Sequence, residues 1–139
     1  MEETRNHLVK TMENYKSGIY DFQALFLKHT NEYIGEAGVL SYKSNSNRGV
    51  LGYNLLPDYW GHGYATEITK ALVKFSFEEM KMERVEALVA DGNESSKKVL
   101  EKSGFILEGT LRNYARINNN YCNVYYYGMI CKDYYGSNH

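Results

Sequence analysis

The stretch that decides the fold reads Trp60-Gly61-His62-Gly63-Tyr64-Ala65-Thr66-Glu67. It lies between a predicted strand, residues 49–56, and a long amphipathic helix. The two glycines let the backbone turn tightly and approach an anion closely, while the first unpaired N–H groups of the helix point outward with the positive end of its dipole. The turn therefore predicts a phosphate cradle for a nucleotide or a pyrophosphate. A plain strand-to-helix connection is the alternative that this segment alone leaves open.

The next predicted strand is followed by a second informative segment, Asn93-Glu94-Ser95-Ser96-Lys97-Lys98-Val99-Leu100-Glu101-Lys102-Ser103-Gly104-Phe105. Together the two segments resemble motifs A and B of the GNAT acetyltransferase superfamily, and they are most similar to the ribosomal-protein N-terminal acetyltransferases of the RimJ/RimL type. That branch has a tryptophan-glycine-x-glycine-tyrosine-alanine turn, then about 30 residues later an asparagine, a serine three positions on, and a glutamate-lysine-x-glycine-phenylalanine ending, all of which stand here. The resemblance runs from about residue 33 to the end of the chain.

Length and composition agree with one compact domain over residues 1–139. The chain has 43% hydrophobic residues and a single proline, which excludes general disorder. Its formal net charge of -1 argues against nonspecific nucleic-acid binding, and no apolar run approaches the roughly 18 to 20 residues that cross a membrane. Met1 to Arg5 lack the basic start and apolar core of a signal peptide, so we expect a soluble, cytoplasmic protein.

The cysteines, histidines and tyrosines add little chemistry. Cys122 and Cys131 are too few for a disulfide framework and lie in strand-like sequence, so we expect free thiols. The four histidines are scattered, and no metal site is expected. Many of the fourteen tyrosines lie near the C-terminal end, where they form either a cage for a cation or cross-strand packing.

Hydrophobic periodicity and turn residues predict an α+β order of elements. We expect a helix over residues 2–15 that Gly18 ends, strands over 19–29, 33–42 and 48–56, a helix from 65 to about 80, a strand over 84–90, a helix from the N-cap Asn93 to Gly104, and a closing hairpin of strands 105–117 and 121–132.

The resemblance implies the GNAT-type acyl-CoA N-acyltransferase fold, in which helices flank a mixed and mainly antiparallel sheet. Members of the RimJ/RimL branch usually begin with a further strand and helix, which are missing here, so we expect an N-terminally abbreviated domain. We expect either a truncated product or a real variant in which the strand over residues 19–29 becomes an uncovered edge. Such an edge invites pairing with a second copy, and a homodimer is one expectation.

The resemblance also implies a co-substrate, acetyl-coenzyme A (acetyl-CoA). Its pantetheine arm is expected to bond like an extra strand beside Leu55 and Leu56, where strands 49–56 and 84–90 diverge, and a free N–H there is expected to stabilise the oxyanion. Asn93 is expected to contact the arm, and Ser96 to lie near the leaving sulfur and help to protonate it. The pyrophosphate is expected on the turn, at Trp60, Gly61, His62, Gly63, Tyr64, Ala65 and Thr66.

Several of these residues also have a structural interpretation. Asn93 is a good N-cap, and Ser96 in the first helical turn can bond the backbone. Trp60 stands where many superfamily members have glutamine or arginine, and we favour packing as its role. Lys97 and Lys98 are either attractants for the 3′-phosphate of coenzyme A or the solvated face of their helix.

The general base is the least specified part of the site. Enzymes that this chain resembles carry a carboxylate before the last turn and an acidic residue after it, and these places fall on Ala115 and Asn123 here. In the other Rim branch the base falls on Leu88 and the leaving-group tyrosine on Leu100. All four substitutions remove a group that could move a proton.

Glu86 and Glu36 remain as candidate bases, with Tyr127 as a possible proton carrier. Glu86 is also interpretable as a buried structural partner of Arg84. A route through water is sufficient as well, since an amine held beside the thioester needs only partial help to lose its proton.

Three functions remain open on the sequence. The leading one is an acetyl-CoA-dependent N-acetyltransferase that moves an acetyl group to a primary amine, on a protein N-terminus or a small molecule, by direct attack on the thioester. The second is a coenzyme A binding module that has lost catalysis. The third is a tyrosine-rich interaction protein that uses the last hairpin as its surface. Binding of acetyl-CoA separates the first two from the third, and turnover separates the first from the second.

Overall fold

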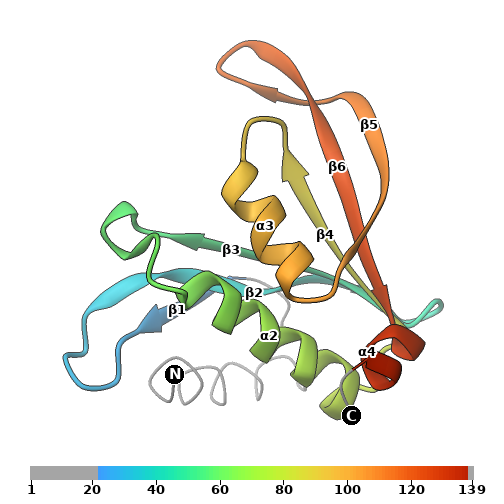
Figure 1. Cartoon of the computed structure of the whole chain (residues 1–139), viewed down its shortest axis with the longest axis horizontal. Coiled ribbons are helices and arrows are strands. Elements are labelled where there is room, and N and C mark those ends of the chain that lie inside the picture. The colour runs from blue at the N-terminus through green and yellow to red at the C-terminus, as the bar shows by residue number, and fades with distance from the viewer. Residues whose placement is uncertain (1–21, 138–139) are drawn as a thin grey trace.

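The computed structural model describes residues 22–137, and Figure 1 shows them as one sheet with helices packed against it. The helix expected over residues 2–15, with its end at Gly18, lies outside the described residues. In chain order the elements are β1 (Gln23–Phe26), β2 (Tyr33–Lys43), β3 (Arg48–Leu55), η1 (Pro57–Tyr59), α2 (Tyr64–Lys74), η2 (Phe75–Glu79), β4 (Arg84–Ala90), α3 (Glu94–Lys102), β5 (Ile106–Ile117), β6 (Asn120–Ile130) and α4 (Cys131–Ser137).

The described strands form one sheet in the order β1-β2-β3-β4-β6-β5. Neighbouring strands are antiparallel except β3 and β4, which are parallel and paired only from Arg48↔Arg84 to Val50↔Glu86. Beyond these pairs the two strands diverge, as Figure 1 shows beside α3. The mixed, mainly antiparallel sheet expected from the sequence is confirmed. Within the described chain β1 and β5 are its edges, and pairing of an edge with a second copy stays a prediction.

The core lies between the sheet and helices α2 and α3. Ile68 and Leu72 recur at helical spacing on α2 and are buried. On β4, the alternating residues Val85, Ala87 and Val89 are also buried, as the period of a strand predicts. Burial of each large apolar side chain contributes about 1.5–3 kcal/mol to the stability of the fold. This interface therefore holds the helices on the sheet.

The helix after the glycine turn is helical to Met80, as predicted, but its last turn widens. The five residues of η2 are π-helical, and Met80 N donates to Phe75 O at 3.0 Å. This wider turn keeps Phe75 and Phe77 buried while the chain turns back toward β4. No helix of the described chain is both long enough and apolar enough to span a bilayer.

Two predictions for the C-terminal end are wrong. Asn120 begins β6, because the hairpin turn needs only Asn118 and Asn119, whose φ angles are 52° and 66°. Cys131 begins helix α4 and does not extend the last strand. The backbone N–H of Ile130 donates to Asp133 Oδ2 at 3.1 Å, so this carboxylate caps the first turn of α4.

Candidate active site

The turn between η1 and α2 has the geometry of an anion cradle. Gly61 and Gly63 have φ angles of 76° and 82°, a left-handed conformation that favours glycine. Gly63 is the N-cap of α2 and has no side chain to cap the first N–H groups of the helix, those of Tyr64, Ala65 and Thr66. A Cβ built on either glycine meets no atom within 4 Å. The turn therefore faces open space with the positive end of a helix dipole behind it.

The other two side chains of the turn, His62 and Trp60, are exposed. His62 lies against Tyr64, with ring centroids 5.8 Å apart. Trp60 is 65% exposed, so the packing role favoured from the sequence is wrong. Its indole Nε1 instead donates to Leu55 O at 2.8 Å, which ties the turn to the end of β3.

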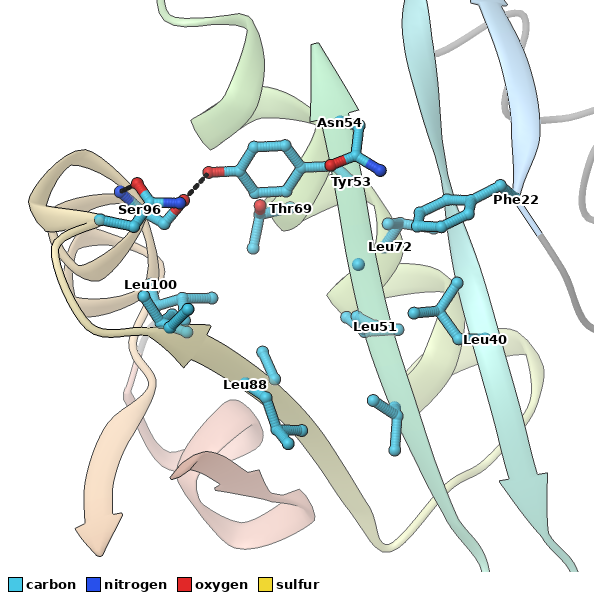
Figure 2. Close-up of a pocket in the computed structure, with 16 residues that line it drawn as sticks. Phe22, Leu40, Leu51, Tyr53, Asn54, Thr69, Leu72, Leu88, Ser96 and Leu100 are labelled. Carbon is cyan, nitrogen blue, oxygen red and sulfur yellow. Dashed lines mark hydrogen bonds between the residues drawn. The ribbon is translucent and has the colours of Figure 1, made fainter. Parts of the chain in front are cut away.

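A cavity of about 420 Å³ lies where β3 and β4 diverge. Figure 2 shows side chains of both strands and of α2 and α3 around it, and the polar ones include Tyr53, Thr69, Asn93 and Ser96. Because strand pairing has stopped at this point, the backbone edges that face the cavity are not joined by a ladder. A ligand with amide donors and acceptors can add to such an edge like an extra strand.

The end of β3 directs one backbone donor away from β2. Leu56 N donates to Ile34 O at 2.9 Å, so the Leu56 N–H is already used. In an antiparallel pair successive N–H groups point to opposite sides of the strand, and the Leu55 N–H is therefore directed away from β2. Of the two donors expected from the sequence, the geometry favours Leu55.

The start of α3 brings Asn93 and Ser96 to the cavity. Asn93 Oδ1 accepts from Ser96 N at 3.3 Å, which confirms the predicted N-cap. The Ser96 hydroxyl is 3.2 Å from that of Tyr53, which reaches across from β3 (Figure 2). Burial raises the pKa of Tyr53. Tyr53 lies in neither sequence motif, although its alternation with Leu51 and Leu55 places it on the side of the sheet that packs against the helices.

Glu86 and Tyr127 do not line the cavity. The register of β4 against β6 puts their side chains on opposite faces of the sheet. The buried Glu86 carboxylate accepts from Arg84 Nε at 2.8 Å and from the Tyr126 hydroxyl at 3.2 Å, so its interpretation as a structural partner of Arg84 is confirmed. Tyr127 is 1% exposed and donates to Glu101 Oε2 at 3.1 Å, and burial raises its pKa.

The two uncharged hairpin positions, Ala115 and Asn123, have structural surroundings. Ala115 pairs with Cys122 at the point where the β5–β6 register resumes after a bulge. Asn123 Oδ1 accepts from the backbone N–H of Asn113, at 3.0 Å, and Asn113 has a φ of 50°. The Asn123 side chain therefore stabilises the bulge and supplies no proton acceptor of the carboxylate type.

The two lysines of α3 have different surroundings. Lys97 forms an ion pair with Glu94 at 3.0 Å and lies 3.7 Å from the centre of the Tyr125 ring. The hydrogen bond to Glu94 is the main reason that the pKa of Lys97 is raised. Lys98 is exposed, and its attraction of the 3′-phosphate stays a prediction.

Comparison with known proteins identifies the family. Residues 1–106 match the family described as acetyltransferase (GNAT) domain, which is more than half of the chain. The chain belongs to the GNAT acetyltransferase family. It is 31% identical over 113 residues to the uncharacterised N-acetyltransferase p20 of Bacillus licheniformis, and this match covers 81% of the chain but only 64% of p20. It is 29% identical to the uncharacterised N-acetyltransferase YoaA of Bacillus subtilis, with 93% of the chain and 81% of YoaA covered.

Solved GNAT structures share its fold. The ribosomal-protein-S5-alanine acetyltransferase of Vibrio fischeri superimposes with a TM-score of 0.79 at 24% identity, covering 92% of this chain and 70% of that one. The spermidine/spermine N-acetyltransferase SpeG of Vibrio cholerae gives a TM-score of 0.78 at 19% identity, covering 94% and 79%. These likenesses confirm the GNAT fold that the two sequence motifs imply.

Proposed function

We propose that this GNAT protein transfers the acetyl group of acetyl-CoA to a primary amine by direct attack of the amine on the thioester. One observation carries the proposal: α2 presents the anion cradle at its first turn and lines the cavity further along with Thr69 and Leu72. A single ligand with a pyrophosphate at one end and an amide-bearing arm therefore fits along one helix and one strand edge. Acetyl-CoA is such a ligand, and its thioester supplies the activated acyl group.

Each part of the site is assigned one task in this proposal. Residues 61 to 66 hold the pyrophosphate through backbone N–H groups. The edge of β3 and Asn93 hold the pantetheine arm. The Leu55 N–H donates to the oxyanion that forms when the amine attacks, and Ser96 donates to the departing sulfur. Holding the thioester and amine together also raises the rate, because a bimolecular reaction becomes effectively unimolecular.

The amine proton is proposed to leave through water. The Glu86 carboxylate is occupied by Arg84 and Tyr126, and the Tyr127 hydroxyl by Glu101, so a catalytic role for either needs a contact to break first. Both are assigned structural tasks here. A positioned water is sufficient because the amine needs only partial help once it is bound.

The acceptor is proposed to be the N-terminal amine of a protein, since the two motifs resemble the RimJ/RimL branch and the Vibrio fischeri relative is named as an acetyltransferase of ribosomal protein S5. A small amine is the other acceptor class, since SpeG is named for spermidine and spermine. Peptides with free and with blocked N-termini, compared with spermidine, separate the two classes.

A second candidate is a coenzyme A binding module without turnover. It is favoured by the uncharged Ala115 and Asn123 and by the occupied Glu86 carboxylate. It shares the cradle and the cavity with the enzyme, so binding alone does not distinguish the two candidates. Release of a thiol in the presence of an amine does.

The test combines calorimetric titration of acetyl-CoA with an assay of thiol release. His62→Glu places a negative charge at the cradle, where it repels a pyrophosphate but suits the helix dipole and leaves the fold intact. Thr110→Glu adds the same charge on β5, away from the cradle. We expect binding by the wild type and Thr110→Glu, and a loss of roughly tenfold or more in affinity for His62→Glu. Absence of binding by folded wild-type protein rules out both candidates.

A further inference from the structure

We infer that Tyr53 is a positioning residue for Ser96: its hydroxyl donates to Ser96 Oγ and so directs the Ser96 proton toward the leaving sulfur of the thioester. The inference rests on the proposed acetyl transfer and assigns a task to a residue that neither sequence motif contains.

The Ser96 hydroxyl differs from the hydroxyls of Ser76, in η2, and Ser103, the C-cap of α3. Ser76 and Ser103 each donate to the carbonyl four residues earlier, at 2.8 Å. Such a bond uses up the hydroxyl proton inside the helix. Ser96 lies in the first turn of α3, and within the described residues its hydroxyl contacts the Tyr53 hydroxyl at 3.2 Å. Its proton is therefore not committed to the helix.

The inference assigns Tyr53 as the donor of the Tyr53–Ser96 hydrogen bond. Either hydroxyl can donate on geometry alone. No carboxylate lines the cavity within the described residues, and the Tyr53 hydroxyl lies 3.2 Å from Ser96 Oγ. Burial raises the pKa of Tyr53 and outweighs the opposite effect of the hydrogen bond with Ser96, so the hydroxyl keeps its proton at neutral pH. With Tyr53 as donor, the Ser96 proton is left for a third group.

In this inference the third group is the leaving sulfur of the thioester, and the cavity sets its position. Ser96 N is fixed by Asn93 Oδ1 at 3.3 Å, and Tyr53 reaches Ser96 from the opposite wall, so the hydroxyl pair spans the gap between β3 and α3 (Figure 2). An arm that adds to the β3 edge passes beside this pair. A hydroxyl that accepts one hydrogen bond becomes a better donor of the next, so Tyr53 both aims and strengthens the Ser96 donor.

The chemical step involves no proton loss from Tyr53. The amine nitrogen forms a bond to the acetyl carbon, the C–S bond breaks, and its electron pair goes to sulfur. The nitrogen releases its proton to water. The negative charge on sulfur is stabilised by the hydrogen bond from Ser96 until the thiolate takes a proton from water.

Tyr53→Phe tests the inference, because it removes the hydroxyl and keeps the ring. Tyr42→Phe is the matched control. Tyr42 lies on β2, and its partly buried hydroxyl donates to Asn47 Oδ1 at 2.7 Å. We expect Tyr53→Phe to lower kcat roughly tenfold while the Kd for acetyl-CoA stays unchanged, which is the pattern of an interaction made only in the transition state. Tyr42→Phe is expected to keep the wild-type kcat.

Ser96→Ala and the double variant complete a mutant cycle. If Tyr53 acts through Ser96, then Tyr53→Phe has no further effect on kcat in the Ser96→Ala background. Equal kcat for wild type and Tyr53→Phe, or additive losses in the double variant, overturns the inference and leaves the proposed acetyl transfer in place. A wild type that binds no acetyl-CoA or releases no thiol overturns both.

Discussion

Arg84 on β4 and Glu108 on β5 form an ion pair that crosses the intervening strand β6, with Arg84 Nη1 3.1 Å from Glu108 Oε2. The pair passes over Gly128, where a Cβ would lie 2.7 Å from both side chains. Arg84 also bonds Glu86 on its own strand. One guanidinium therefore ties β5 to β4 on the face of the sheet that carries Glu86, and Gly128 provides the space for it.

Stability is predicted to depend on pH through Glu108. The Arg84 guanidinium holds the pKa of Glu108 below its usual value of 4.5. A carboxyl whose pKa is lowered on folding stabilises the fold above about pH 4.5, and this stabilisation is lost as the pH falls through its lowered pKa. We expect the Tm difference between wild type and Glu108→Gln to be largest near neutral pH and to shrink in acid. A difference that is constant with pH contradicts this assignment.

Glu86→Gln is predicted to act on stability and not on catalysis. It replaces a buried carboxylate that accepts from Arg84 and Tyr126, and loss of a hydrogen bond to a charged group costs about 1.5–3 kcal/mol. Thermal unfolding measures the loss. The exposed Glu83, just before β4, provides the control Glu83→Gln, which is expected to leave Tm unchanged. If Glu86→Gln keeps its Tm but loses kcat, Glu86 is the general base after all.

Asn93 is predicted to serve both the fold and the ligand, and two substitutions separate these tasks. Asn93→Ser keeps an N-cap oxygen, whereas Asn93→Ala removes it at a cost of about 0.5–2 kcal/mol. We expect only Asn93→Ala to lower the free energy of unfolding, and both variants to weaken acetyl-CoA binding. If Asn93→Ser binds acetyl-CoA with wild-type affinity, Asn93 serves only as the N-cap of α3.

Gly63→Ala is predicted to destabilise the protein although the new methyl group meets no atom within 4 Å. The reason is the φ of 82°, which costs a residue with a Cβ about 1–2 kcal/mol. Gly109→Ala is the matched control, because Gly109 also has open space around it but an ordinary φ. Chemical denaturation of the two variants measures the difference. Equal stabilities contradict a strained backbone at the cradle.

Local sequence signals predicted much of this fold. The glycine turn, the apolar stripe of the following helix, the alternation of Val85, Ala87 and Val89, and the Asn93 cap all depend on residues close together in the chain. Such features follow from backbone sterics and from the periods of helix and strand, which need no distant partner. Helix α4 could not be predicted in this way, because the Tyr134 ring stacks on Phe77, 57 positions earlier in the chain, at 5.0 Å.

By itself, the sequence determined the glycine turn before α2, the order of the described strands and of helices α2 and α3, and membership of the GNAT fold class through two motifs. Only the tertiary structure decided which side chains meet at the cavity. It brought Tyr53 to Ser96, and it placed Glu86 with Arg84 on the other face of the sheet. The physical reason is that the strand period fixes only the face of the sheet on which a side chain lies. The residue that this side chain contacts depends on where β3 and β4 stop pairing, and contacts between residues distant in the sequence set that point.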